Sequence, residues 1–329
     1  MYKQYFRMKV HMPYKFTDDR RHKFDKKKYR LRNWAEYEEG LKNRGSLTIW
    51  FTEDAIKSWV PDNVTKKRGG QVKYSDLAIE TALQVRSVYG LPLRQSEGFL
   101  TSIADLMGLD IEIPDHSTLS RRSGKLKVEN LRRDKGEAVI LIVDSTGLKM
   151  VGKGEWCEEK WGPCKRKVWR KLHLAIDEST GEILSSELTD NRTGDETILP
   201  DLVNAIDEDI EIVMGDGAYD TSDFEERFPG IIPIIPPRID ATISKDFDSC
   251  PSIRDSHIEF IDIKGRMSWQ EESGYNKRCL VETTMGRYKK IIGPSLRSKN
   301  LDSQKVEAKI GCLILNKMTV LGMPKTHRV

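Results

Sequence analysis

The feature that most constrains the fold of this chain is an unbroken apolar run at residues 138–143, Ala-Val-Ile-Leu-Ile-Val. A strand that is apolar on both faces belongs in the middle of a sheet covered by helices on both sides. We expect this strand to end at Asp144. A second buried strand is predicted at 211–214, and it is followed by Gly215, Asp216 and Gly217. Two buried strands that each end in an aspartate predict a polar crevice at the edge of the sheet.

The pattern after residue 138 indicates a mixed sheet with helices on both faces. An insertion at about 238–272 is polar, with one candidate strand at 257–263, and a long helix is expected from Tyr275. The other predicted strands lie at 148–151, 171–177, 182–188 and 231–235, and the other predicted helices at 198–206, 224–228 and 306–320. This α/β or α+β order resembles that of a ribonuclease-H-like, retroviral-integrase-like fold.

The first 134 residues show a helical pattern instead. We divide the chain into a basic arm (1–33), a mainly helical region (34–134) and a catalytic domain (135–329). Ser75 is a predicted N-cap for a helix that stops at Gly90, and further helices are expected at 93–107 and 117–126. The apolar residues predicted to be buried in this region include Trp34, Leu41, Leu47, Trp50, Ile56, Trp59, Phe99, Leu100, Ile103 and Leu106.

The last two of these helices resemble a helix-turn-helix, although the loop between them is longer than the usual tight turn. The second helix would offer basic side chains to DNA. These DNA-binding candidates are Arg121, Arg122 and Lys125, with Ser117 and Thr118 beside them. A plain helical subdomain with a charged last helix is the alternative.

Charge and cysteine content narrow the class of protein. The net charge is +4, and basic residues are concentrated between Lys3 and Arg32. A phosphate backbone is the natural partner of such an arm, and its truncation should flatten the salt dependence of binding; a solvated arm is the alternative. Five cysteines without a CxxC pair indicate neither a zinc ribbon nor a disulfide framework. We expect a cytoplasmic protein, because no signal peptide or membrane-spanning run is evident.

Four polar residues share one face of the helix predicted from Tyr275. At about 100° per residue, Tyr275, Arg278, Glu282 and Lys289 fall at about 0°, 300°, 340° and 320°. A single carboxylate framed by two cations and a phenol suits neither a solvated helix nor a core stripe. It suits a carboxylate that holds a cation while its neighbours hold a polyanion.

The three acids form the candidate catalytic site. One aspartate after a strand is usually a turn former, but Asp144, Asp216 and Glu282 together make an all-oxygen site suited to Mg²⁺ or Mn²⁺. Two such ions about 4 Å apart would activate a nucleophile and neutralise the leaving oxygen in attack on phosphorus. Arg278 and Lys289 would hold the flanking phosphates.

These motifs resemble those of a known family. The spacing Tyr275-x2-Arg278-x3-Glu282-x6-Lys289 matches the Y-R-E-K signature of DDE transposases from prokaryotic insertion sequences. The segments 143–149, 169–177 and 215–220 are similar to blocks of the insertion-sequence-five family. The resemblance implies that the three acids bind metal and that Tyr275, Arg278 and Lys289 grip the terminal DNA. It also implies an assembly that is at least dimeric and synapses two DNA ends.

The implied enzyme is a transposase that acts on double-stranded DNA. It would cut terminal inverted repeats by phosphodiester hydrolysis and join the 3′-hydroxyl ends to target DNA by transesterification. A stand-alone metal nuclease of the same fold is one alternative. A domesticated, non-catalytic DNA-binding regulator is another, which the presence of all three acids disfavours.

Several residues keep two interpretations. Asp220 is expected to cap a helix near residue 221, Asp177 to form a turn, and His173 to be packed rather than to face the acids. The tryptophans that either stack on a base or serve packing are Trp156, Trp161 and Trp169. Trp269 is the aromatic that we expect first to stack on a base.

Overall fold

The computed structural model describes residues 28–61, 71–129, 138–150, 169–245, 247, 249 and 251–329. Most of the predicted basic arm, the loop at 66–70, Trp156 and Trp161, and three of the five cysteines lie outside these residues. Of the remaining cysteines, Cys279 is exposed and Cys312 is buried. Within the described ranges, no helix combines the length and apolarity that crossing a bilayer requires.

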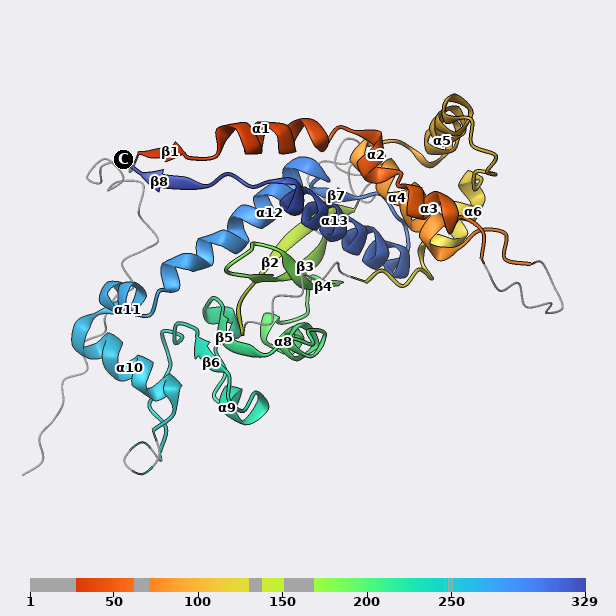
Figure 1. Ribbon diagram of the computed structural model, residues 1–329. Coiled ribbons are helices and arrows are strands. Elements are labelled where there is room, and N and C mark those ends of the chain that lie inside the picture. Colours follow the sequence, from red (N-terminus) through yellow and green to blue (C-terminus); the bar gives the residue numbers. More distant parts are fainter. Residues whose placement is uncertain are drawn as a thin grey trace, which may run out of the picture.

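A mixed sheet forms the centre of the molecule (Figure 1). Its strands are β2 (Val139–Met150), β3 (Trp169–Asp177), β4 (Ile183–Asp190), β5 (Ile210–Met214) and β6 (Ile232–Ile234), in the order β4-β3-β2-β5-β6. β2, β3 and β4 are antiparallel neighbours, whereas β5 runs parallel to β2 and β6 runs parallel to β5. A short strand, β7 (Ser295–Leu296), pairs with the end of β2. This order confirms the expected ribonuclease-H-like fold.

The first strand is longer than predicted. β2 does not end at Asp144 but continues to Met150, so the segment predicted as a separate strand is its second half. β2 continues past Asp144 because it stays paired with β3, where Asp144 lies opposite Leu174. Gly147, which lies between the two predicted strands, faces the indole of Trp169, and a Cβ there would lie 3.1 Å from a ring carbon. The glycine therefore makes room for a ring that covers the strand.

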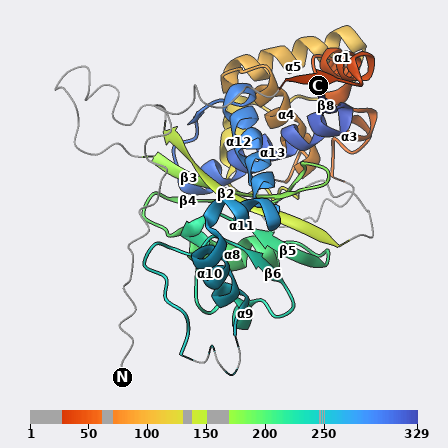
Figure 2. The same cartoon turned by 90° about the vertical axis from the view of Figure 1, so that its left-hand side faces the viewer.

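Helices cover both faces of the sheet, as predicted. Leu141 and Val143 point to the face packed against α8 (Asp195–Asn204) and α9 (Phe224–Arg227). Ile142 and Leu174 point to the other face, which packs against α12 (Cys279–Ile291) and α13 (Leu301–Leu321). Figure 2 shows α12 and α13 on the opposite side of the sheet from α8 and α9. Because Asp144 follows Ile142 by two residues, its side chain belongs to the α12 face.

The N-terminal region is helical. It contains α1 (Trp34–Asn43), α2 (Leu47–Trp50), α3 (Glu53–Lys57), α4 (Asp76–Val88), α5 (Leu93–Met107) and α6 (His116–Ser123). Ser75 caps α4 as predicted, accepting a 3.0 Å hydrogen bond from the Ala78 backbone. Trp50 and Trp59 are buried, but Trp34, Leu41 and Leu106 are exposed, and their predicted burial is wrong. Leu106 lies about 120° around α5 from the buried Leu100, beyond the packed face.

Helix α13 joins the helical region to the sheet. Its residues Ile310 and Ile314 pack with α4 and its neighbours, whereas Cys312 and Leu315 pack on the sheet side. Figure 1 shows α13 between the two. The two ends of the described chain are also paired, because β1 (Tyr29–Leu31) and β8 (Thr326–Arg328) form a two-stranded antiparallel sheet. The helical region and the sheet therefore share one helix as a common core.

The insertion is helical rather than extended. α10 (Ile253–Lys264) and α11 (Arg266–Glu272) replace the strand predicted at 257–263, which is wrong. The start of α10 is a capping box: the Ser252 hydroxyl accepts from the Asp255 backbone at 3.1 Å, and the Asp255 carboxylate accepts from the Ser252 backbone at 3.3 Å. A Ser-x-x-Asp sequence is the signal that would have predicted this helix.

Candidate active site

The residues of the Y-R-E-K pattern do not all lie on one continuous helix. Tyr275–Arg278 form a 3₁₀ turn, η3, that begins after Gly274 with φ +72°, and α12 starts at Cys279. A 3₁₀ turn places residues three apart above one another. Arg278 and Glu282 are four residues apart and remain neighbours on the helix surface. The shared face therefore survives, although the predicted single helix does not.

Arg278 connects two of the three predicted acids. Its Nη1 donates a 2.7 Å hydrogen bond to Oδ2 of Asp144, and its Nη2 donates to Oε1 of Glu282. The three side chains come from η3, β2 and α12. The structure therefore brings together residues that are 134 positions apart in the sequence. The Arg278 and Asp144 side chains are 20% and 14% exposed, which strengthens their attraction relative to that of a surface pair.

Asp144 has a perturbed pKa. Burial raises the pKa of its carboxyl group, and the nearby negative charge of Asp216 raises it further. The backbone N–H of Ser145, 2.7 Å from Oδ1, and the Arg278 guanidinium oppose this rise without cancelling it. The charge of Asp216 therefore acts on Asp144 and disfavours its ionised form.

Close packing leaves little room for side chains on either side of Asp216. A Cβ at Gly215 would lie 3.0 Å from the Tyr219 ring and 3.1 Å from the Val143 side chain. A Cβ at Gly217 would lie 3.3 Å from the carbonyl oxygen of Pro236. The Asp216 carboxylate accepts a 2.9 Å hydrogen bond from Ala218, which starts the short helix η2 (Gly217–Tyr219). The Gly-Asp-Gly sequence thus sets the aspartate at the end of β5.

The donor set fits a hard divalent cation, but the three acids do not form a closed cluster. Among the described residues, no three carboxylate, imidazole or thiolate groups lie close enough together to hold a metal ion. Asp144 and Asp216 supply the oxygen ligands that Mg²⁺ and Mn²⁺ prefer. Glu282 is held to Asp144 through the Arg278 guanidinium rather than directly. Arg278 therefore provides positive charge beside the predicted metal ligands.

A short aromatic stack supports Arg278. Its guanidinium lies 5.9 Å from the ring centroid of Tyr275, which lies 5.2 Å from that of Trp269. His257 of α10 makes an edge contact with Trp269, with 5.3 Å between the ring centroids. Trp269 is 2% exposed, so in this structure it presents no free ring face to a base. The packed rings thereby connect the insertion to Arg278, which contacts two of the predicted catalytic acids.

Comparison with known families identifies the chain. Residues 135–317 match a family model described as a transposase DDE domain, and residues 42–153 match a second model with the same description. The first match spans more than half of the chain. This chain belongs to the DDE transposase family. The finer resemblance to the insertion-sequence-five family stays a prediction.

Two solved transposase structures are similar to this transposase at low scores. The piggyBac transposase synaptic complex with hairpin DNA has a TM-score of 0.36 and 9% identity, covering 89% of this chain and 77% of that chain. The Mos1 strand transfer complex has a TM-score of 0.23 and 12% identity, covering 77% of this chain and 79% of that chain. The assignment rests on the family match and not on these likenesses.

A charged cluster on the opposite face of the sheet was not predicted. Asp195, at the start of α8, lies 2.7 Å from Nζ of Lys171 and 3.3 Å from Nδ1 of His173. Burial acts to raise the pKa of Asp195, but the nearby His173 and Lys171 side chains bring it down to about 2. His173 is buried and lies 2.9 Å from Thr189 Oγ1, which confirms the predicted packed histidine. In the sequence, the position of His173 between Leu172 and Leu174 in a predicted strand indicates a packed side chain.

Two predicted aspartate roles have different outcomes. Asp177 forms a turn as predicted, because its Oδ2 accepts from the hydroxyls of Ser179 and Thr180 at 2.7 Å. The predicted helix cap at Asp220 is wrong. Asp220 instead accepts a 2.8 Å hydrogen bond from Arg254 Nε and thereby ties η2 to α10. The sequence contains no local signal for a partner 34 residues away.

The predicted DNA-binding residues of the helical region are in different environments. Arg121 and Lys125 are exposed at and after the end of α6. Arg122 donates to the Tyr74 carbonyl and to the Asp76 carboxylate, so it ties α6 to α4. Lys289 is half-buried on α12, about two turns after Glu282.

Proposed function

We propose that this transposase cuts DNA at the ends of an insertion sequence and joins the freed 3′-hydroxyl groups to target DNA. The Asp144–Arg278–Glu282 contact is the observation that supports it most, because it gathers two of the predicted acids and the signature arginine from separate elements. The proposed partners are the double-stranded terminal repeats and target DNA, bound by a dimer or higher oligomer that synapses two ends.

The proposed roles of the acids follow from their chemistry. Asp144 and Asp216 would hold divalent ions, either Mg²⁺ or Mn²⁺, and Glu282 would complete the set when Arg278 turns to a DNA phosphate. Bound ions would lower the pKa of the attacking water or hydroxyl and neutralise the leaving oxygen. The close packing around Gly215 and Gly217 would hold Asp216 in place at the end of β5.

Basic and phenolic groups would position the DNA. Arg278 presents two donors in a fixed fork that matches a phosphate, and Lys289 would add a point charge farther along, on α12. Burial raises the pKa of the Tyr275 phenol, so its hydroxyl stays protonated and can donate to a phosphate oxygen. These groups would orient the scissile phosphate toward the acids.

The test uses linear DNA carrying the short inverted repeats that flank the reading frame. Purified wild-type protein, Glu282→Gln and Asp144→Asn are compared with Glu272→Gln, an exposed acid on α11. We expect wild type and the Glu272 variant to cut and join DNA in Mg²⁺, and the other two to bind DNA without cutting. Unchanged cutting by the Glu282 variant would exclude the proposed site.

The same assay separates the alternatives. Cleaved ends without joined product would indicate a stand-alone nuclease. Binding without any metal-dependent cleavage by the wild type would indicate a regulator.

A further inference from the structure

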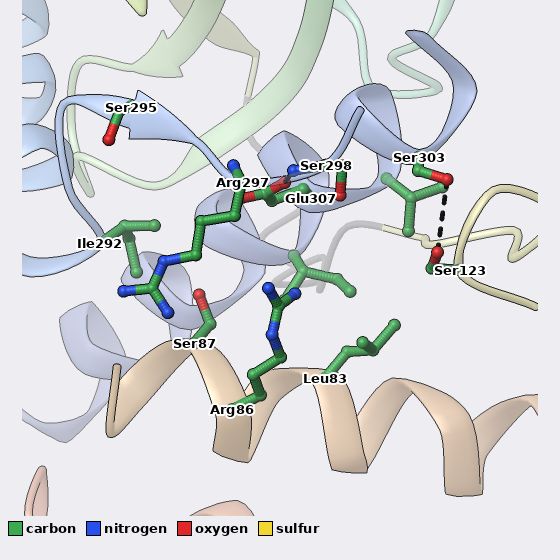
Figure 3. Close-up of a pocket in the computed structure, with 12 residues that line it drawn as sticks. Leu83, Arg86, Ser87, Ser123, Ile292, Ser295, Arg297, Ser298, Ser303 and Glu307 are labelled. Atoms are coloured by element: carbon green, nitrogen blue, oxygen red, sulfur yellow. Dashed lines mark hydrogen bonds between the residues drawn. The ribbon is translucent and has the colours of Figure 1, made fainter. Parts of the chain in front are cut away.

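A polar pocket lies between the helical region and the sheet, away from the catalytic acids. The open space at this site is about 490 Å³, including solvent outside its mouth. The pocket lies between α4, the end of α6, the segment after β7 and the start of α13 (Figure 3). Its polar lining consists of Arg86, Ser87, Ser123, Ser295, Arg297, Ser298, Ser303 and Glu307. All twelve lining residues belong to the described part of the chain.

Two guanidinium groups approach this pocket from opposite walls. Figure 3 shows Arg86 extending from α4 toward the segment that carries Arg297 and Ser298. Arg297 extends back to the end of α4, where its Nη1 donates to the carbonyls of Gly90 and Leu91 at 3.0 and 3.2 Å. Burial lowers the pKa of Arg86. The negative charge of Glu307 raises this pKa and the positive charge of Arg297 lowers it, and the net change is downward.

Arg86 is the group that lacks a partner. Its Nε is buried, and no described residue offers its side chain a hydrogen bond or an ion pair within 4.0 Å. The nearest acid in the pocket, Glu307, instead accepts from the backbone N–H groups of Arg297 and Ser298, both at 2.8 Å. A buried guanidinium nitrogen without an acceptor is costly, so the pocket has an unmet requirement for an anion.

Hydroxyl groups complete the lining. Within the described residues, the hydroxyls of Ser87, Ser295 and Ser298 have no protein hydrogen-bond partner, whereas Ser123 and Ser303 contact each other at 3.3 Å. Several free hydroxyls beside two guanidinium groups match the oxygen-rich surface of a phosphate group.

We propose that this pocket binds a phosphate group, and that the group belongs to the backbone of bound DNA. The inference about DNA rests on the proposed function. Met150 at the end of β2 pairs with Leu296, next to Arg297, so the pocket lies at the far end of the strand that carries Asp144. Six residues of strand correspond to about 20 Å, or about six nucleotide steps of one DNA strand. This separation fits one duplex that reaches from the pocket to the acids.

The test compares Arg86→Gln and Ser87→Asp with wild type and with Arg227→Gln, an arginine on α9 outside the pocket. Ser87→Asp places a carboxylate beside both guanidinium groups, so it should raise thermal stability while excluding phosphate. In EDTA, inorganic phosphate should raise the melting temperature of wild type and of the Arg227 variant, relative to chloride at equal ionic strength. It should have no such effect on the two pocket variants.

A 30-base-pair duplex provides the second arm. Its affinity is measured against salt concentration in EDTA, and the slope of log K against log salt should fall by about one in both pocket variants. If phosphate raised the melting temperature of these variants as much as that of the wild type, the proposed phosphate site would be wrong. If phosphate no longer raised the melting temperature of the variants but their salt dependence of duplex binding equalled that of the wild type, the pocket would bind free phosphate. The proposal that it binds the DNA backbone would then be wrong. Because neither arm involves cleavage, failure of the proposed catalysis would leave both results interpretable.

Discussion

Arg278 and Asp144 form a 2.7 Å hydrogen-bonded ion pair that ties the start of α12 to the middle of β2. The same guanidinium donates to Glu282, so one cation serves two acids. A third acid, Asp216, is near enough to raise the pKa of Asp144. This arrangement makes Arg278 a competitor of any metal ion for these carboxylates.

Replacement of Arg278 by glutamine should therefore strengthen metal binding in the absence of DNA. A hydrogen-bonded charge pair contributes about 1.5–3 kcal/mol, so Mn²⁺ should bind roughly tenfold more tightly or better. Electron paramagnetic resonance of free Mn²⁺ would measure the affinity. Lys277→Gln is the matched control, since Lys277 is the preceding residue and pairs with Glu178 instead. Equal or weaker Mn²⁺ binding by the Arg278 variant would contradict competition.

The pKa of Asp195 predicts a pH-dependent contribution to stability. Its folded pKa of about 2 is below the ordinary value of 3.8, so the contribution is present above 3.8 and is lost as the pH falls through 2. Asp195→Asn should reduce the free energy of unfolding by about 2 kcal/mol at neutral pH and by little near pH 2. Urea unfolding across this range measures the difference. Asp201→Asn, on the same helix and exposed, should show no such trend.

Trp269 should act through packing. Trp269→Ala removes a buried ring between Tyr275 and His257 and should cost about 3–5 kcal/mol, whereas Trp269→Phe should retain most of the stability. DNA cleavage should fall together with stability, because Tyr275 and Arg278 lose their support. The base-stacking hypothesis makes the opposite prediction: the alanine variant would unfold like the wild type yet lose selective DNA binding.

The contact between α12 and α13 depends on the absence of a side chain at Gly311. A Cβ there would lie 2.7 Å from the Tyr288 ring, so Gly311→Ala should destabilise the protein by about 1–3 kcal/mol despite the better helix propensity of alanine. Gly286→Ala is the control in α12, where a Cβ meets no atom within 4 Å and should stabilise by up to about 1 kcal/mol. Thermal unfolding of both variants measures this contrast, and equal shifts would exclude a packing role for Gly311.

Some elements followed from local signals and others did not. Ser75 capped α4 where the sequence predicted it, and Leu93–Met107 formed a helix with the predicted bounds, because caps and periodicity act within a few residues. The extent of β2 was missed, since Gly147 is a strand residue only when Trp169 from another strand covers it. The insertion is helical because a capping box at Ser252 starts α10, and this local signal prevails over the strand predicted at 257–263.

The sequence by itself determined the fold order, the acids at 144, 216 and 282, and the spacing of Tyr275, Arg278 and Lys289 around them. Residue type and spacing carry these features. Only the tertiary structure decided that Arg278 joins Asp144 to Glu282, that Trp269 is buried under Tyr275, and that α13 serves two cores. Periodicity marks which face of a helix is apolar or charged, but the partner of that face is selected by packing between segments far apart in the chain.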